Sequence, residues 1–260
     1  MKFSAFLISL FFLSNTILAQ FGEKIATARP GVANGSGVVG KGILQFQAGV
    51  QYNQTDFETI ELSTETSNIS ENLVVRFGLS ERWEVSTVLS YSSAETRLGS
   101  TGEIKQRTGF SNSLLRARFI LAKNLAIQAA VSMPLYQNDY KTDYAASQFR
   151  IMYTTRFTDY FSLVTNLGFR WDGFERSPDG FYALKLITNL SKNFILITES
   201  FGSFDRSAFR DTYNAGIGYF LNNDLLIDVS GGFNKYAAQQ GYFFTAGASY
   251  RMITPFRKEK

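Results

Sequence analysis

The stretch Leu44-Gln45-Phe46-Gln47-Ala48-Gly49-Val50-Gln51-Tyr52 alternates apolar and polar residues over nine positions. Successive side chains of a β-strand point to opposite faces, so this period of two predicts a strand with one apolar and one polar face. About nine to eleven residues is also the length that a tilted strand needs to cross a bilayer. The stretch therefore predicts a membrane-spanning strand.

The rest of the chain repeats this unit, with short and long connectors in strict alternation. In the short connectors the flanking apolar residues lie four positions apart, as in Leu79/Trp83 and Leu190/Phe194, which is typical of three-residue hairpin loops. Short turns at one end and long polar loops at the other are the layout of outer-membrane barrels. The predicted strands are 42–53, 70–79, 83–92, 110–121, 125–136, 147–157, 161–171, 181–190, 194–204, 212–221, 225–233 and 241–252. The predicted long connectors are 53–69, 93–109, 137–146, 172–180, 205–211 and 234–240.

Only a closed barrel satisfies every backbone hydrogen-bonding group of a sheet inside lipid. A soluble β-sandwich or lipocalin-like barrel would place the bulky apolar faces inside. In this chain those faces point outward, and the opposite faces of the strands are too charged to form a dry core. The sequence therefore predicts an all-β fold, a 12-stranded antiparallel transmembrane β-barrel with both termini periplasmic. We expect it in the cell outer membrane of a Gram-negative bacterium.

Four segments follow from this interpretation. Residues 1–19 are read as a signal peptide, with a charged start, an apolar run too short for a membrane anchor, and a cleavage box ending at Ala19. Residues 20–41 are an irregular N-terminal segment, 42–253 the transmembrane barrel, and 254–260 a basic C-terminal tail.

Composition excludes several functions. The chain has 26 Lys and Arg against 22 Asp and Glu, and loses one lysine with the signal peptide, which is too mild an excess to indicate nucleic acid. Cysteine and histidine are absent, which excludes disulfides and thiolate metal ligands and removes the usual base of membrane-barrel hydrolases. We therefore predict no enzyme activity, no catalytic residues, no cofactor and no metal site. Acidic residues of the connectors could hold calcium but are read as solvated charges: Asp139, Asp143, Asp172, Glu175 and Asp179.

The stretch from Gly35 to Gly42 fits the pattern G-x-G-x-x-G of nucleotide-binding loops. That motif needs a strand before it and a helix after it, so that the phosphate meets a helix N-terminus. Here a strand follows. The stretch reads as flexible backbone leading into the first strand.

The polar faces of the strands carry charges that the barrel would direct inward. Charged residues on the lipid face cost roughly 2–4 kcal/mol each near mid-bilayer, which supports this phase. Lys185 and Glu199 are equally distant from the Leu190/Phe194 turn and should lie opposite each other. The predicted channel-lining residues are Arg76, Glu84, Arg116, Arg118, Arg150, Arg156, Arg170, Lys185, Glu199, Asp228 and Arg251.

These charges have two interpretations. They could line an aqueous path whose cationic excess favours anionic or polar solutes. Alternatively, they could pair across a narrow lumen and plug it, since twelve strands lie between the filled eight-stranded barrel and the open porin. The weakest strand is 194–204, where Ile195, Ile197 and Phe201 would join Glu199 inside, so its register or facing is open.

At residues 27–49 the chain resembles a known family. Thr27-Ala28-Arg29-Pro30-Gly31, then 38–42 and 44–49, and the turn 77–85, are similar to the bacterial outer-membrane family labelled "putative MetA-pathway of phenol degradation". Glu199 and Tyr250-Arg251 also look similar. In that family an acidic residue often precedes the Arg-Pro pair, whereas this chain has Ala28. The resemblance covers nearly all of the mature chain and implies a barrel that transports small aromatic or hydrophobic molecules, without established active-site residues.

Together these observations predict a monomeric outer-membrane channel for small solutes, either aromatic or anionic molecules, that pass by diffusion through a charged lumen. Its partners would be outer-membrane lipid and a small-molecule solute, with no nucleic acid. The alternative is a closed structural barrel whose long extracellular loops bind a surface partner. A histidine-free membrane enzyme is the third hypothesis.

Overall fold

A computed structural model of the chain describes residues 23–59, 62–111, 113–135, 140–205 and 208–256. The predicted signal peptide, residues 1–19, and the last four residues of the predicted basic tail lie outside the described residues. Within the described part, no helix is long and apolar enough to cross a membrane.

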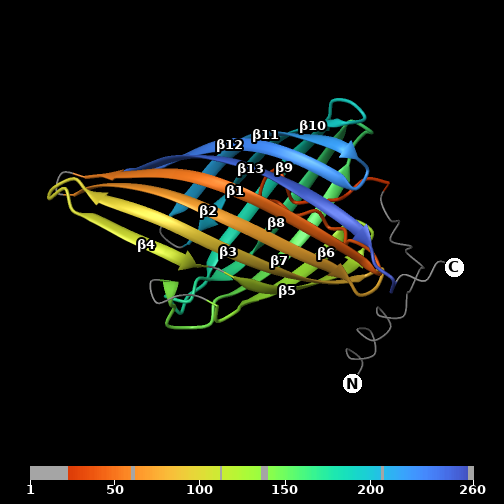
Figure 1. Cartoon of the computed structure of the whole chain (residues 1–260), viewed down its shortest axis with the longest axis horizontal. Coiled ribbons are helices and arrows are strands. Elements are labelled where there is room, and N and C mark those ends of the chain that lie inside the picture. Colours follow the sequence, from red (N-terminus) through yellow and green to blue (C-terminus); the bar gives the residue numbers. More distant parts are fainter. Residues whose placement is uncertain (1–22, 60–61, 112, 136–139, 206–207, 257–260) are drawn as a thin grey trace, which may run out of the picture.

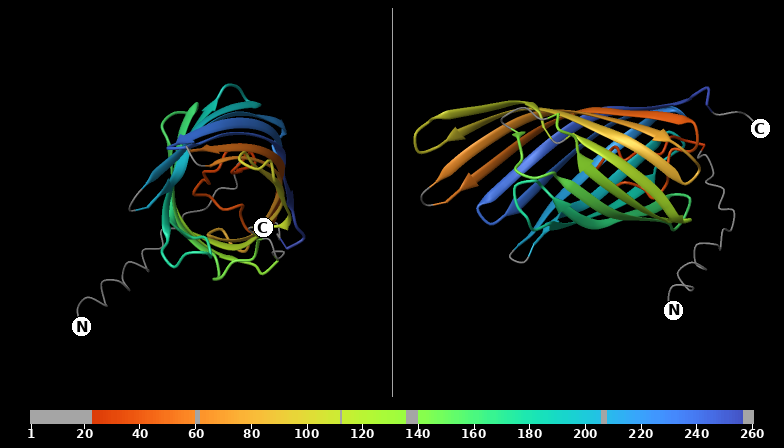
Figure 2. Two further views of the ribbon diagram at one scale, coloured as in Figure 1. Left: turned by 90° about the vertical axis from the view of Figure 1, so that its left-hand side faces the viewer. Right: turned by 90° about the horizontal axis from the view of Figure 1, so that it is seen from below.

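The described chain forms a closed antiparallel barrel (Figures 1 and 2). β1 pairs with β2 on one side and with the last strand, β13, on the other, which closes the ring. β4 and β5 are two halves of one strand that both pair with β3, so the barrel has the predicted twelve strand positions. The strands are β1 (Ile43–Glu58), β2 (Ser63–Gly78), β3 (Trp83–Leu98), β4 (Ile104–Phe110), β5 (Leu114–Ala122), β6 (Leu125–Ser132), β7 (Ser147–Arg156), β8 (Phe161–Trp171), β9 (Asp179–Asn189), β10 (Phe194–Phe204), β11 (Phe209–Asn222), β12 (Leu225–Tyr236) and β13 (Gln239–Ile253).

The two faces of each strand follow the predicted alternation. In β1, Gln45 and Gln47 are buried in the barrel, whereas Val50 and Tyr52 are exposed on its outer surface. Large apolar residues are exposed in the same way on all the remaining strands of the ring. A surface of this kind is stable only against lipid, because a soluble protein would bury such side chains.

Tight hairpins join the strands at one end of the barrel, which we call the short-turn end. Leu190 N–H donates to the Phe194 carbonyl (3.0 Å), as Phe157 does to Phe161. These hydrogen bonds close the three-residue loops that the spacing predicts. In the β5–β6 and β11–β12 hairpins a bulge tightens the turn by one residue.

The opposite end, the long-loop end, differs from the prediction. The predicted connectors 53–69 and 93–109 are mostly strand, since β1–β3 each extend for 16 residues. With β4 they project beyond the rest of the barrel (Figure 1). Their tips are mostly polar on both faces, so hydrophobic alternation could not reveal them. Ladder hydrogen bonds and side-chain hydrogen bonds between the strands, such as Thr66–Thr96 (3.0 Å), sustain the pairing.

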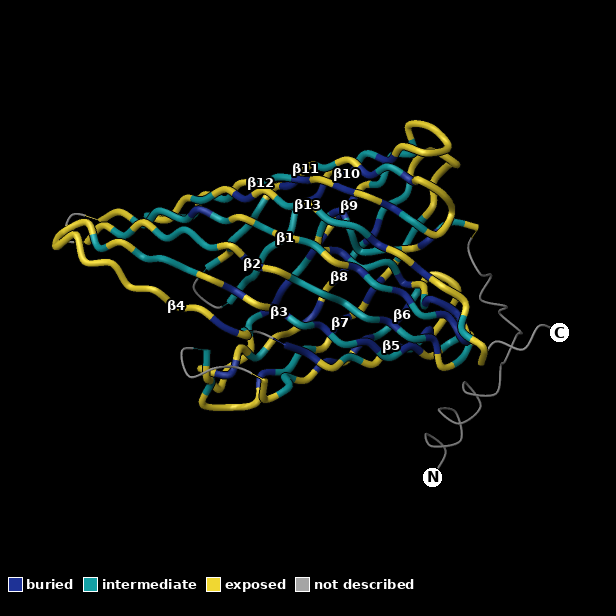
Figure 3. The backbone as a smooth tube through the Cα atoms, viewed as in Figure 1, coloured by how far each residue is buried: buried dark blue, intermediate teal, exposed yellow. Residues whose placement is uncertain are grey.

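Residues 23–42, here called the inner segment, lie inside the ring. They contain no strand, as predicted, but they are not a flexible approach to β1. The end-on view shows this part of the chain within the barrel (Figure 2), and Ala33 is completely buried there. The interior of the protein is therefore the contact between the barrel wall and the inner segment, and buried positions alternate with more exposed ones along the strands (Figure 3).

Candidate functional site in the barrel lumen

Glu199, on β10, holds the middle of the inner segment. Its carboxylate accepts hydrogen bonds from the backbone N–H groups of Val32 (2.9 Å) and Ala33 (2.6 Å) and from the amide of Asn214 (3.2 Å). Gly31 turns the chain so that these N–H groups point to one place. Its φ is +105°, and an added Cβ would lie 2.7 Å from a Glu199 oxygen, so only glycine fits.

Glu84, on β3, holds the end of the inner segment near the short-turn end. It accepts two hydrogen bonds from the Arg76 guanidinium (both 2.8 Å) and one from the Val39 N–H (2.9 Å). Arg118 lies 4.0 Å from the same carboxylate. A buried carboxylate that binds two cations and a backbone donor is fully paired, so this cluster is a structural anchor.

Arg29 belongs to the inner segment itself, and its side chain extends from the segment to the wall. Its guanidinium binds Asp228 with two hydrogen bonds, of 2.9 and 3.1 Å. The group lies over Gly49 and Gly247, which are paired residues of β1 and β13. A Cβ at either glycine would lie within 2.5 Å of the guanidinium, so the two glycines form the slot that admits it.

The cations of the wall bind backbone carbonyl groups of the inner segment. Lys185 donates to the carbonyl of Ala28 (2.6 Å), and Arg76 donates to that of Ala26 (3.0 Å). Arg118 and Arg251 donate to the carbonyl groups of Gly37 and Glu23, respectively. Carboxylates of the wall thus bind donors of the segment, and cations bind its acceptors. An irregular backbone buried in this way needs such partners, since it has no strand to pair with.

Uncharged side chains complete the contact. Asn166 accepts from the Asn34 N–H and donates to the Asn34 carbonyl, both at 2.8 Å. Thr154 accepts from the Ser36 N–H (3.0 Å). Backbone groups of the Gly35–Gly42 stretch, which has the nucleotide-loop pattern, therefore form hydrogen bonds with side chains of the barrel wall.

Apolar contacts explain the facing of β10, the strand predicted at 194–204, which the sequence left open. Ile195 of β10 is buried and packs with Ile25 of the inner segment, and Phe201 of the same strand packs against Ala33 and its neighbours. Ile197 is also buried, at 1% exposure. These side chains do face inward beside Glu199, because the inner segment supplies an apolar surface there.

Lys185 and Glu199 are register partners of β9 and β10, as predicted. Within the described part of the chain they do not form an ion pair within 4.0 Å. Each instead binds the inner segment, so neither of the two sequence interpretations describes this pair completely.

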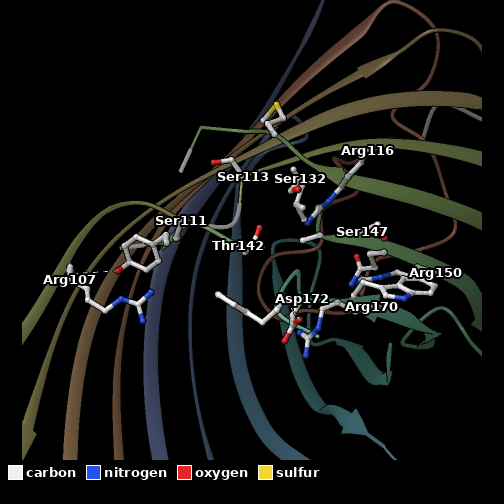
Figure 4. Close-up of a pocket in the computed structure, with 17 residues that line it drawn as sticks. Arg107, Ser111, Ser113, Arg116, Ser132, Thr142, Ser147, Arg150, Arg170 and Asp172 are labelled. Carbon is white, nitrogen blue, oxygen red and sulfur yellow. Dashed lines mark hydrogen bonds between the residues drawn. The ribbon is translucent and has the colours of Figure 1, made fainter. Parts of the chain in front are cut away.

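The predicted channel-lining residues fall into three groups. One group forms direct hydrogen bonds with the inner segment: Arg76, Glu84, Arg118, Lys185, Glu199, Asp228 and Arg251. Arg116, Arg150 and Arg170 lie nearer the long-loop end, where they line a cavity of about 360 Å³ (Figure 4). Arg156 stands apart, exposed at the short-turn rim and paired with Asp159 (2.9 Å).

The acidic connector residues are dispersed. Among the described residues, no group of three or more carboxylates lies together in a way that could hold a metal ion. Asp172 accepts hydrogen bonds from the N–H groups of Phe174 and Glu175, and Asp179 lies 4.0 Å from Arg170. Asp139 lies outside the described residues.

Sequence patterns do not mark Arg29, Asn166 or the glycine pair of positions 49 and 247 as site residues. None of them breaks the strand alternation, so periodicity gives no signal for them. The two signals present were the Arg29-Pro30-Gly31 motif and the unusual apolar inner face of 194–204. Both concern the inner segment.

Comparison with known proteins extends these findings. The sequence family described as Putative MetA-pathway of phenol degradation matches residues 27–252. No curated protein matches the chain. The COG4313 outer membrane channel from Pseudomonas putida F1 is similar over 84% of this chain and 98% of that chain, with a TM-score of 0.66 and 8% identity.

Two translocator barrels have the same fold. For the translocator domain of autotransporter NalP from Neisseria meningitidis, the similarity covers 84% of this chain and 90% of that chain, with a TM-score of 0.61 and 11% identity. For the beta domain of the Bordetella autotransporter BrkA, it covers 81% and 99%, with a TM-score of 0.59 and 13% identity. These outer-membrane folds, together with the exposed apolar belt, place the barrel in the outer membrane.

Proposed function

The chain belongs to the family described as Putative MetA-pathway of phenol degradation, and from this premise and the lumen geometry we propose that it is an outer-membrane channel for small solutes, gated by the inner segment. The short-turn end faces the periplasm and the long-loop end faces outward. Solutes cross by diffusion when the inner segment is displaced. The proposed activity is transport, not catalysis.

The observation that carries this proposal is the nature of the lumen filling. A narrow structural barrel fills its interior with side chains of its own strands. Here the filling is a separate 20-residue segment, held by side chains of the wall and covalently joined to it at β1. Such a segment can leave the lumen without opening any strand pair of the ring.

The cavities between the inner segment and the long-loop end also support transport. Val32 is 42% exposed and lines a second cavity, of about 270 Å³, together with Arg150 and Arg170. Those two arginines also line the larger cavity near the long-loop end. A solute that enters from that end would therefore reach the outer surface of the inner segment.

A reversible lock tests this proposal. Thr27 Oγ1 and Ser249 Oγ lie 2.9 Å apart, so the double variant Thr27→Cys/Ser249→Cys should form a disulfide that ties the inner segment to β13. The chain has no cysteine of its own, so the introduced pair is unambiguous. Single-channel conductance of the purified barrel would be recorded in a planar bilayer before and after reduction.

We expect silent oxidised protein and conductance steps after reduction, while each single cysteine variant conducts in both conditions. Equal conductance of the oxidised and reduced double variant would refute gating by this segment. Silence in every form, with the barrel folded, would refute the channel.

A second candidate is a closed structural barrel that binds a surface partner at the long-loop end. The observation that favours it is the projection of β1–β4, whose polar tips extend beyond the rest of the wall (Figure 1). This candidate requires silence in every form of the lock experiment and retention of partner binding by the locked barrel.

A further inference from the structure

We infer that the cavity of about 360 Å³ near the long-loop end is a binding site for a small carboxylate with an apolar body, of which a benzoate-sized aromatic acid is the simplest example. This inference deepens the proposed transport function by naming a solute class. The binding step itself does not require that the barrel conducts.

The cavity lies where the regular wall is interrupted. β4 pairs with β3 only and ends at Phe110, and β5 begins at Leu114. β6 ends at Ser132, and the backbone N–H of the next residue, Met133, donates to the Ser113 carbonyl (2.9 Å) beside this interruption. Figure 4 shows side chains of β4, β5, β6 and β7 around one space. The interruption makes room that a continuous strand would occupy.

The charge in this space is strongly unbalanced. Among the described residues of the lining, Arg116, Arg150 and Arg170 carry positive charge, and Asp172 carries the one carboxylate. One oxygen of Asp172 already accepts two backbone hydrogen bonds from its own loop. Arg170 lies 4.0 Å from Asp179 outside the cavity, and Arg107 stacks on Tyr140. Arg116 and Arg150 have no carboxylate within 4.0 Å in the described part of the chain.

Three buried donors in the lining lack partners. Nε of Arg116, Nε of Arg150 and the hydroxyl of Ser113 make no hydrogen bond among the described residues. Arg150 is 7% exposed and Ser113 is 1% exposed. Burying unpaired donors of this kind is costly, and guanidinium groups suit a planar carboxylate, which can accept hydrogen bonds from both Arg116 and Arg150. The geometry is that of an anion site.

The remaining side chains of the lining determine the chemistry of the ligand beyond its carboxylate. Leu114, Met133, Trp171 and Phe174 present apolar surface to the same space. The volume falls in the range of about 300–1,000 Å³ that small-molecule sites usually have. A bare inorganic anion would leave the apolar surface uncovered, and a neutral aromatic molecule would leave the guanidinium groups unpaired. Only a ligand with both parts satisfies both halves.

The site is two hydrogen bonds away from the inner segment. Arg150 donates to Asn166 (3.0 Å), and the same Asn166 oxygen accepts the Asn34 N–H (2.8 Å). A carboxylate that draws Arg150 towards the cavity would compete for this hydrogen bond. The ligand that we infer therefore binds next to an anchor of the gate.

Tryptophan fluorescence provides the test, because the chain has two tryptophans and only one lines the cavity. In the Trp83→Phe background, Trp171 reports on the site in the otherwise complete barrel. Benzoate, benzamide, acetate and inorganic phosphate would each be titrated. We expect a saturable change with benzoate, and at least roughly tenfold weaker binding of the other three, since each lacks one half of the ligand.

Variants locate the site. Arg116→Gln and, separately, Arg170→Gln should each weaken benzoate binding roughly tenfold. The matched control, Arg97→Gln, removes an arginine that is exposed on the projecting part of β3, and should leave binding unchanged. The heat-modifiable migration of each variant verifies that its barrel is folded.

Equal binding of phosphate and benzoate, equal binding of benzamide and benzoate, or a missing fluorescence response would each overturn the inference. The outcomes separate it from the proposed function. Benzoate binding by a barrel that stays silent in the lock experiment supports the site and removes the channel. Gated conductance without benzoate binding does the reverse.

Discussion

The two halves of the lumen use the same residue types in opposite ways. In the half towards the short-turn end, every anchor has a specific partner, as Glu84 has Arg76 and Glu199 has the N–H groups of Val32 and Ala33. In the half towards the long-loop end, Arg116 and Arg150 retain buried donors without partners. The difference teaches that inward charge alone does not define a channel lining. The charges of the first half hold the inner segment in the lumen, whereas the Nε groups of Arg116 and Arg150 have no hydrogen-bond partner among the described residues.

The largest effect should come from Glu199→Ala, which removes the acceptor of three hydrogen bonds. We expect the inner segment to lose about 3 kcal/mol of docking free energy, because hydrogen bonds to a buried carboxylate are strong. Hydrogen exchange of residues 23–42 should then accelerate by roughly a hundredfold. The amides of β11–β13 serve as the internal reference. Unchanged protection of the inner segment would show that the carboxylate is not an anchor.

Gly49→Ala should have the next largest effect. Its new Cβ would lie 2.3 Å from the Arg29 guanidinium, which must then leave its slot and weaken its pairing with Asp228. We expect a loss of about 2 kcal/mol in docking, measured by the same exchange experiment. Gly37→Ala is the matched control, since a Cβ there would contact nothing within 4 Å. Similar exchange in both variants would mean that the slot is unimportant.

Arg118→Gln and Arg116→Gln compare the two halves directly, since the arginines lie two residues apart on β5. The first should weaken docking by about 1.5 kcal/mol, because Arg118 binds the Gly37 carbonyl and stands beside Glu84. The second should leave docking unchanged but reduce the anion preference, read as the reversal potential under a salt gradient. The comparison fails if the two variants give the same pair of results.

Arg156→Gln should have the smallest effect, although Arg156 belongs to the predicted channel lining. Its side chain is 65% exposed and its partner Asp159 is 89% exposed, and pairs of this kind contribute at most about 0.5 kcal/mol. Thermal unfolding and reversal potential should both match those of the unmodified chain. A shifted reversal potential would extend the solute path to the short-turn rim.

The sequence predicted the wall better than its contents. Strict alternation at 44–52 and the four-residue spacing about the short turns fixed the strand number and the opposition of Lys185 and Glu199, because both follow from local backbone geometry. The extensions of β1–β3 escaped detection, since strands outside lipid need no apolar face. The inner segment has no periodicity, so its position depends on contacts with residues up to 228 positions away.

The inner segment immediately precedes β1, and β1 pairs with β13, the last strand to be synthesised. Arg29 rests on a glycine from each of these two strands, and Thr27 bonds to Ser249 of β13. These contacts straddle the seam at which the ring closes, so they cannot form until the final strand has been added. Occupation of the lumen is thus a signature of completed assembly, and residues 23–42, which precede every strand of the ring in the sequence, are the last to reach their place.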